Sequence, residues 1–187
     1  MGLQKIVAIA GLSLAVSAAA APDIRTVKPD LVVPALADGK PAAGKRVKGV
    51  HPDWRHTAVY HVLYLPRDWQ PGNKYPVLVE YAGNGPYRNP FGDVSTGHPE
   101  GSNIGYGISG GKGFIWLCLP YLDDVGKHNV TQWWGTPPKR RAQPTVNYAK
   151  KTLPWICEQF GGDRKRVVMC GFSRGAIACN FIGLHED

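Results

Sequence analysis

Glycine and proline occur so often in this chain that a fold built mainly of long helices is excluded. The 187 residues include 23 glycines and 16 prolines, about a fifth of the total, whereas roughly 12% is usual. Both residue types destabilise helix interiors, which excludes a helical bundle or a coiled coil. A hydrophobic fraction of 43% with 19% charged residues excludes a disordered chain. With no Gly-X-Y period or internal repeat, the sequence indicates one loop-rich globular domain.

The first twenty residues predict an export signal. Lys5 is followed by an apolar run at 6–16 and by small residues at 17–20. This is the three-part pattern of a secretory signal peptide, with cleavage expected after Ala20. The apolar run is too short to cross a bilayer, which needs about 20 residues. We therefore expect a secreted or periplasmic protein without a membrane span, in which the Pro-rich segment 21–44 is a tether and 45–187 is the folded domain.

Apolar runs bounded by glycine or proline alternate with helical patterns. Strands are predicted around 45–50 and at 57–65, 77–81, 114–119 and 167–170. Helical spacing covers 144–160, with a kink expected from Pro154, and 176–184. This alternation predicts an α/β fold, a mostly parallel central sheet between two helical layers. The glycine-rich segment 83–113 is expected to be a loop that shapes a pocket.

The formal net charge of +8 leaves two interpretations open. Basic residues cluster at 139–141, 150–151 and 164–166, either as solvated surface or as a site for an anionic substrate or cell-surface polymer. Because the chain carries an export signal, nucleic acid is not expected as a partner. The oligomeric state stays open.

Motifs for cofactors and metals fail when their context is considered. Residues 105–110 match G-x-G-x-x-G, but no strand is predicted directly before them and no helix after them. His51, Asp53 and His56 lie on one short loop without a second ligand group. Cys118 and Cys170 fall in predicted buried strands, and a Cys157–Cys179 disulfide stays open. We therefore expect no cofactor and no metal.

Residues 171–175 read Gly-Phe-Ser-Arg-Gly and match the G-x-S-x-G pattern of a serine nucleophile. The predicted strand 167–170 runs directly into them and the predicted helix 176–184 runs directly out. This is the context of a nucleophile elbow, a sharp turn that exposes a serine hydroxyl. Gly171 and Gly175 remove side chains where strand and helix crowd together. Ser173 is the predicted nucleophile, with a plain strand–helix turn as the alternative.

An oxyanion hole needs two backbone N–H groups close to the nucleophile. One comes from the residue after the serine, here Arg174. The other comes from the loop after an earlier strand, where 82–85 read Ala-Gly-Asn-Gly. We assign the second donor to Asn84, with Gly85 as its neighbour; a simple turn is the alternative for this segment.

Three segments together resemble a known superfamily. Residues 60–66 (YHVLYLP), 74–85 (KYPVLVEYAGNG) and 160–175 (FGGDRKRVVMCGFSRG) are similar to α/β-hydrolases. They are closest to secreted esterases of the polyhydroxybutyrate-depolymerase and feruloyl-esterase type. The resemblance implies Ser173 as nucleophile, Arg174 as an oxyanion donor, and cleavage of a small-molecule or polymeric carboxylic ester through an acyl-enzyme.

The chain departs from that superfamily after the elbow. The family places its acid and histidine after the nucleophile, yet only residues 174–187 follow Ser173. His185 lies about 18 Å along the helix at ~1.5 Å per residue, too far to act as base. His98 or His128 would give a non-standard arrangement. We therefore expect the N-terminal part of a longer protein, incomplete after the elbow helix, inactive alone, with the strand 167–170 unpaired on one side.

Two other functions stay open. The segment 161–167 before the elbow is also similar to prolyl-oligopeptidase-type serine peptidases. Alternatively, the chain is a non-catalytic surface-binding module that stacks aromatic side chains on polysaccharide. The residues for such stacking are Trp54, Trp69, Tyr106, Trp133 and Trp134.

Overall fold

The computed structural model describes residues 21–184 except 91, 93 and 134–140. The chain divides into two units, Met1–Asp30 and Leu31–Asp187. In the first, the described residues form one short 3-10 helix, η1 (Ile24–Thr26). The predicted signal peptide and its cleavage site lie outside the described residues. Within the described part of the chain, no helix combines the length and apolar character that a membrane crossing requires.

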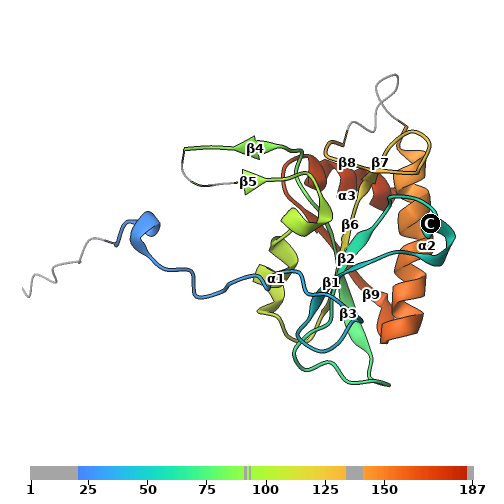
Figure 1. Ribbon diagram of the computed structural model, residues 1–187. Helices are drawn as coiled ribbons and strands as arrows, with labels where there is room; N and C mark the ends of the chain where they lie inside the picture. The colour runs from blue at the N-terminus through green and yellow to red at the C-terminus, as the bar shows by residue number, and fades with distance from the viewer. Residues whose placement is uncertain (1–20, 91, 93, 134–140, 185–187) are drawn as a thin grey trace, which may run out of the picture. The chain divides into compact units, whose positions relative to one another are not determined.

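The second unit is built on a five-stranded sheet (Figure 1). Its strands, in spatial order, are β1 (Arg46–Gly49), β2 (His61–Tyr64), β6 (Ile115–Leu119), β3 (Tyr75–Tyr81) and β9 (Gly162–Gly171). The β6–β3–β9 part is parallel, and β1 and β2 extend it in antiparallel pairing. The predicted α/β fold is confirmed, with an antiparallel extension that the sequence did not indicate.

Not all of the predicted tether is separate from the sheet. The backbone N–H of Ala37 donates to the carbonyl of Arg46, and that of Gly44 donates to Leu65. Leu36 and Ala43 form isolated bridges to the same two residues. The end of segment 21–44 therefore lies along the antiparallel part of the sheet.

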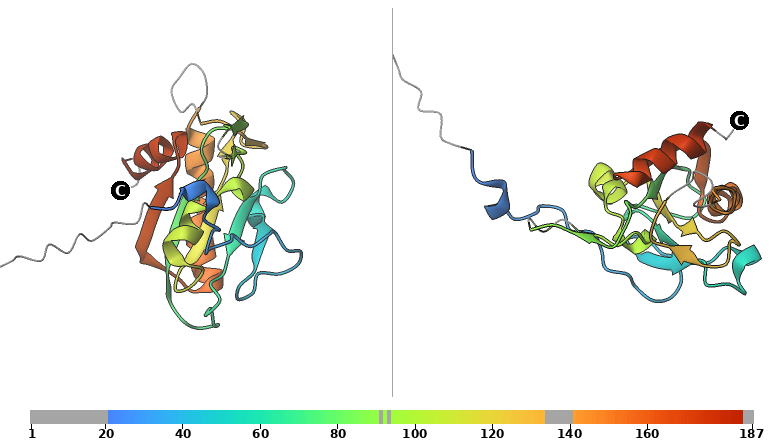
Figure 2. Two further views of the ribbon diagram at one scale, coloured as in Figure 1. Left: turned by 90° about the vertical axis from the view of Figure 1, so that its left-hand side faces the viewer. Right: turned by 90° about the horizontal axis from the view of Figure 1, so that it is seen from above.

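Among the described residues, three α-helices cover the sheet: α1 (Ile104–Ser109), α2 (Gln143–Phe160) and α3 (Arg174–Leu184). Figures 1 and 2 show α1 on one face and α2 and α3 on the other. Because successive side chains of a strand point to opposite faces, the buried residues form two clusters. Leu78 and Trp116 pack with Tyr106 of α1, whereas Val79 and Leu117 belong to the cluster of α2 and α3.

The predicted helix 144–160 is confirmed as α2, and it ends as expected. Gly161 adopts the left-handed conformation at φ 78° and its N–H donates to the Cys157 carbonyl. A Cβ at Gly161 would lie 2.2 Å from the Asn73 carbonyl oxygen, so a side chain is excluded there. The helix continues through Pro154.

The prediction of a plain loop at 83–113 is wrong. The segment contains the small hairpin β4 (Tyr87–Arg88) and β5 (Val94–Ser95), the 3-10 helix η3 (Pro99–Gly101), and α1. Helix propensity did not indicate α1, because two of its six residues are glycines, which disfavour helix. Hydrogen bonds to the Glu80 carboxylate on β3 stabilise it.

Two other short elements complete the unit. The 3-10 helix η2 (Pro52–Trp54) precedes β2, and a second hairpin, β7 (Tyr121–Leu122) with β8 (Asn129–Val130), follows β6.

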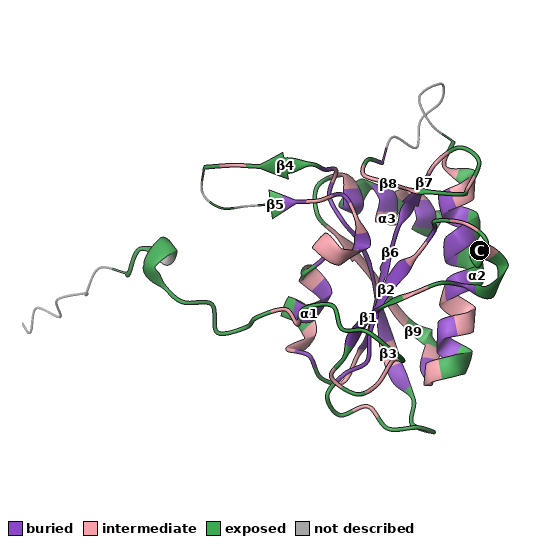
Figure 3. Ribbon diagram, viewed as in Figure 1, coloured by how far each residue is buried: buried purple, intermediate pink, exposed green. Residues whose placement is uncertain are grey.

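The strand β9 forms one edge of the sheet, as the sequence predicts. Among the described residues it pairs with β3 alone. Val168 in its centre is 51% exposed, and Figure 3 shows β9 less buried than β3 beside it. An apolar strand edge of this kind is a template for further pairing.

No disulfide occurs in the described residues. Cys118, Cys157, Cys170 and Cys179 are all free thiols, the first two buried. The Cys179 thiol donates to the carbonyl of Cys170 at 3.0 Å. The interpretation of Cys118 as a small buried hydrophobic residue is confirmed.

Candidate active site

Ser173 occupies a strained backbone conformation at the turn between β9 and α3. Its φ is 52°, the one positive φ of a non-glycine residue among those described. Left-handed backbone is unfavourable for L-residues with a Cβ and is concentrated at functional sites. Ser173 is also exposed. The predicted strand–turn–helix is therefore present, with its serine presented to solvent.

The glycines on either side of Ser173 allow three backbone segments to meet. A Cβ on Gly171 would lie 2.4 Å from the carbonyl carbon of Gly175. A Cβ on Gly175 would lie 2.1 Å from the carbonyl oxygen of Tyr81 at the end of β3. Both distances are shorter than any Cβ contact allows, so the start of α3 reaches β3 only because both positions are glycine.

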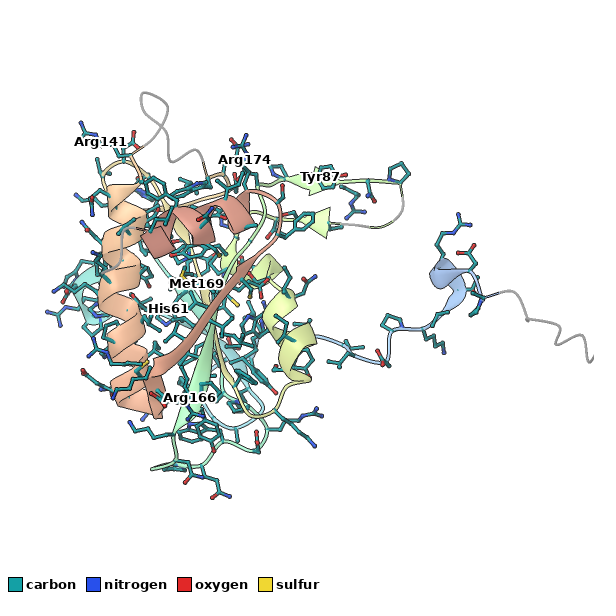
Figure 4. The ribbon with its side chains drawn as sticks, turned by 180° about the vertical axis from the view of Figure 1, so that it is seen from behind. His61, Tyr87, Arg141, Arg166, Met169 and Arg174 are labelled. Carbon is teal, nitrogen blue, oxygen red and sulfur yellow. The ribbon has the colours of Figure 1, made fainter. Side chains whose placement is uncertain are left out.

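The loop after β3 touches the elbow directly. A Cβ on Gly83 would lie 2.6 Å from Cδ1 of Phe172 and 3.2 Å from its carbonyl oxygen. The two segments assigned to the oxyanion hole, that of Asn84 and that of Arg174, are therefore brought together. Figure 4 shows Arg174 at the start of α3, at the same end of the sheet as Tyr87 of β4. The partial positive charge of a helix N-terminus thus lies at this end of the sheet.

Asn84 also has a side-chain contact that the sequence did not reveal. Its Oδ1 accepts a hydrogen bond from the Trp133 backbone N–H at 2.7 Å. The neighbouring Gly85 N–H donates to the Thr131 carbonyl at 2.8 Å. These two bonds fix the loop after β3 against residues 131–133.

The aromatic residues suggested for stacking on sugars contribute to the core. Trp133 is 4% exposed and packs against Phe181 and Tyr121. Tyr106 is 6% exposed, and Trp54 and Trp69 pack partly buried against the larger cluster. Trp134 lies outside the described residues. The four described rings are therefore core or partly buried residues.

An open cavity of about 440 Å³ lies beside the elbow. Its wall includes Ala82 and Gly83 after β3, Ser102 and Ile104 around the start of α1, and Phe172 of the elbow. Ser173 itself is not part of the wall, but its neighbour Phe172 is. The expectation that segment 83–113 shapes a pocket is therefore met, although the segment is not a plain loop. A volume of this size is typical of small-molecule sites.

Glu80, which sequence reasoning missed, is a buried carboxylate in this wall. It is 1% exposed and accepts four hydrogen bonds. Three come from the backbone N–H groups of residues 103, 104 and 105, at 2.7–3.1 Å. The fourth comes from the Trp116 indole at 2.9 Å. A carboxylate that accepts the free N–H groups of a first turn stabilises the helix, which explains why α1 forms.

Arg46 on β1 is the second buried charge on this face. It is 5% exposed, and its Nη2 donates to the carbonyls of Pro99, Glu100 and Ser102. Its guanidinium lies 4.9 Å from the centre of the Trp116 ring. Glu80 thus binds the N–H groups at the start of α1, and Arg46 binds the carbonyls of η3 and Ser102.

No described imidazole is in place to activate Ser173. His128 is exposed and pairs with Asp123 at 3.0 Å in the hairpin of β7 and β8. His98 precedes η3. Among the described residues, neither imidazole forms a hydrogen bond with Ser173. His185 lies outside the described residues.

Other candidate chemistry is also missing near the elbow. Burial raises the pKa of the Cys170 thiol to about 12 and that of Cys179 to about 11, so neither is a thiolate nucleophile at neutral pH. In the part of the chain described, no group of three or more His, Cys, Asp or Glu could hold a metal ion. The motif at 105–110 runs through α1 and does not follow a strand.

The basic cluster 164–166 lies away from the elbow. All three side chains are exposed on β9, and Arg166 pairs with Asp163. Figure 4 shows Arg166 towards the end of β9 opposite to Arg174. Solvated surface explains this cluster, whereas residues 139 and 140 lie outside the described part.

Comparison with known proteins gives partial similarity to solved structures. No protein-family model matches the chain, and no curated protein is similar to it in sequence. A CE1 ferulic acid esterase from the anaerobic fungus Anaeromyces mucronatus, solved without substrate, has a TM-score of 0.48 and 22% identity. That similarity covers 87% of this chain and 59% of the esterase.

The same type of esterase in complex with ferulic acid gives a TM-score of 0.45 at 19% identity, over 87% of this chain and 58% of that one. Aspergillus niger EstA has a TM-score of 0.37 and 16% identity. That similarity covers 65% of this chain and 22% of EstA. The chain spans 59% of the length of the first esterase. With identities of 16–22% and TM-scores below 0.5, these similarities assign neither a family nor a role to this chain.

Proposed function

We propose that this chain carries the nucleophile of an exported serine hydrolase that cleaves carboxylic esters. One observation carries the proposal: Ser173 is exposed and held at φ 52° between a strand and a helix. Such strain is kept where the surrounding structure enforces it, and it is concentrated at functional sites. Glycine would fit this backbone without strain, so the serine at this position has a function beyond the turn.

The proposed reaction forms and breaks an acyl-enzyme on Ser173. Its hydroxyl attacks the ester carbonyl, and the alcohol leaves as the acyl-enzyme forms. The backbone N–H groups of Arg174 and Asn84 hold the negative charge that develops on the carbonyl oxygen. The contact between Gly83 and Phe172 supports this pairing, because it brings the two donor segments together. Water then releases the acid.

The general base and its acidic partner come, in this proposal, from residues outside the described part of the chain. A base must reach the serine hydroxyl within about 3 Å, and no described histidine is bonded to Ser173. The open edge at β9 is consistent with further structure beside the elbow. Export is part of the proposal on the strength of the pattern at 1–20.

The test is hydrolysis of p-nitrophenyl acetate by the protein expressed from its complete coding sequence. Ser173→Ala is expected to lower kcat/KM by at least about 1000-fold, since it removes the attacking atom. Ser109→Ala is the matched control, because its hydroxyl bonds within α1, outside the cavity wall. Equal rates for the wild type and Ser173→Ala would contradict the proposal.

A panel of matched esters and amides separates esterase from peptidase. Amide cleavage also requires protonation of the leaving amine. Turnover of esters with slow turnover of the amides is expected, and faster cleavage of a proline-containing peptide would assign the peptidase instead.

A further inference from the structure

Ser95 on β5 holds the peptide unit that carries the assigned oxyanion donor, the Asn84 N–H. The Ser95 hydroxyl donates to the Gly83 carbonyl at 2.8 Å in a buried hydrogen bond. That carbonyl and the Asn84 N–H belong to one planar trans peptide, in which they point in opposite directions. A hydrogen bond that fixes the carbonyl therefore fixes the direction of the N–H as well.

The Asn84 N–H has no acceptor of its own among the described residues. The next N–H along the chain, that of Gly85, donates to the Thr131 carbonyl at 2.8 Å. Asn84 is also partly exposed, whereas Gly85 is buried. Of these two groups, the Asn84 N–H is therefore the one that remains for a substrate oxygen.

The side chain of Asn84 is tied to the elbow helix. Its Oδ1 accepts a hydrogen bond from the Trp133 backbone N–H at 2.7 Å. Trp133 is 4% exposed, and its ring lies 5.6 Å from that of Phe181 in an edge-to-face contact. Phe181 belongs to α3, the helix that begins at Arg174. The position of Asn84 relative to the other assigned donor thus depends on Trp133, and the direction of its N–H depends on Ser95.

The hairpin of β4 and β5 uses its buried residue for this contact. Of the four residues in the two strands, Ser95 alone is buried. The backbones also meet directly, because a Cβ on Gly85 would lie 2.2 Å from the Thr96 carbonyl carbon. The inner end of the hairpin therefore packs on the loop after β3, with the Ser95 hydroxyl bonded to that loop.

We propose that Ser95 is a positioning residue of the oxyanion hole, whose hydroxyl keeps the Asn84 N–H aimed at the oxygen of the reacting carbonyl. The inference rests on the proposed function, because it concerns the charge that develops after attack by Ser173. Oxyanion donors contribute most when they are held in place before the reaction and need no reorientation during it. A hydrogen bond accepted by a peptide carbonyl also polarises the N–H of the same peptide. Ser95 acts through Asn84 and does not touch the substrate.

Two esters that differ in one atom test the proposal on the protein from the complete coding sequence. They are p-nitrophenyl acetate and its thiono analogue, in which sulfur replaces the carbonyl oxygen. Negative charge then develops on sulfur, a weak hydrogen-bond acceptor, so the oxygen-to-sulfur ratio of kcat/KM depends on the oxyanion donors. Differences in intrinsic reactivity cancel when this ratio is compared between two proteins. Ser95→Ala is expected to lower the ratio about 5-fold, the usual effect of one hydrogen bond.

Ser109→Ala is the matched control for the loss of a serine hydroxyl. Its hydroxyl also donates to a backbone carbonyl, that of Tyr106, but it does not line the cavity. It is expected to leave the ratio unchanged. Ser95→Cys keeps a side chain of similar size with a weak donor, so it should lower the ratio less than Ser95→Ala. An equal slowing of both esters in Ser95→Ala, with a lower Tm, would show a structural role and overturn the inference.

Failure of the inference is distinguishable from failure of the proposed function. Hydrolysis that depends on Ser173 but shows an unchanged oxygen-to-sulfur ratio in Ser95→Ala overturns this inference alone. Equal hydrolysis of p-nitrophenyl acetate by the wild type and Ser173→Ala overturns the proposed function and this inference with it.

Discussion

The two faces of the sheet are stabilised in different ways. The face under α2 and α3 carries the larger cluster, with fully buried aliphatic residues such as Ile156 and Leu117. The face under α1 has a small cluster beside two buried charges, Glu80 and Arg46. The stabilisation from burying apolar surface scales with the area buried. A buried charge, in contrast, is tolerated only where its hydrogen-bond partners are in place. The face with the buried charges is the one that contributes Glu80, Ser102 and Ile104 to the cavity wall.

The largest effect is expected on the polar face, from Glu80→Ala. It leaves four N–H donors without an acceptor, two of them buried and two partly buried, so the free energy of unfolding should fall by about 3 kcal/mol. Urea unfolding followed by far-UV circular dichroism measures it. Glu80→Gln keeps the shape and one acceptor oxygen and should cost about half as much. A loss below about 1 kcal/mol for Glu80→Ala would show that this charge does not organise the face.

On the apolar face, Ile156→Ala is expected to cost about 3 kcal/mol. Ile156 is fully buried in the larger cluster, so the change removes apolar contacts and leaves a cavity. Ile177→Ala is the control, because Ile177 is 51% exposed, and it should cost less than about 0.5 kcal/mol. Equal losses for the two variants in the same urea titration would refute the assignment of the core to this face.

The buried imidazole of His61 should make the apolar face sensitive to acid. His61 is 1% exposed, bonds to the Tyr148 hydroxyl, and faces His51 and Trp155. Burial, aided by the charge of His51, lowers its pKa from 6.5 to about 3. Between these values the unfolded chain binds a proton that the folded chain does not, so stability falls as pH falls.

The expected loss from His61 is about 2 kcal/mol at pH 5 relative to pH 7. It is measured as the free energy of unfolding in urea across pH 4–7. The slope of the free energy of unfolding against pH gives the number of protons taken up on unfolding. In His61→Phe this number should be smaller by close to one in the lower half of the pH range. An unchanged slope would show that another group causes the acid sensitivity.

The smallest predicted effect lies at the elbow. Ser173→Gly should raise the free energy of unfolding by about 1 kcal/mol, because glycine adopts φ 52° without a Cβ clash. Ser173→Ala keeps the Cβ and should stay within about 0.5 kcal/mol of the wild type. Lower stability of Ser173→Gly than of Ser173→Ala would contradict stored strain at this turn.

Local sequence patterns predicted most of the sheet and the elbow. The strands β3 and β6, and the part of β9 at 167–170, are short apolar runs close to glycine or proline, which is a local signal for a strand. The turn at Ser173 is encoded by its own glycines, which is why it was found. Glu80 and Arg46 gave no signal, because their roles depend on residues that are distant in the chain.

The sequence by itself determined the α/β alternation and the position of Ser173, since both follow from nearest neighbours and hydrophobic period, whereas the open edge of β9 was expected from the resemblance to α/β-hydrolases. Tertiary structure decided that residues 104–109 form a helix, because the acceptor for its first N–H groups is Glu80, more than twenty residues earlier on another strand. Hydrogen bonds between strands and loops depend on three-dimensional placement, and no local pattern encodes them.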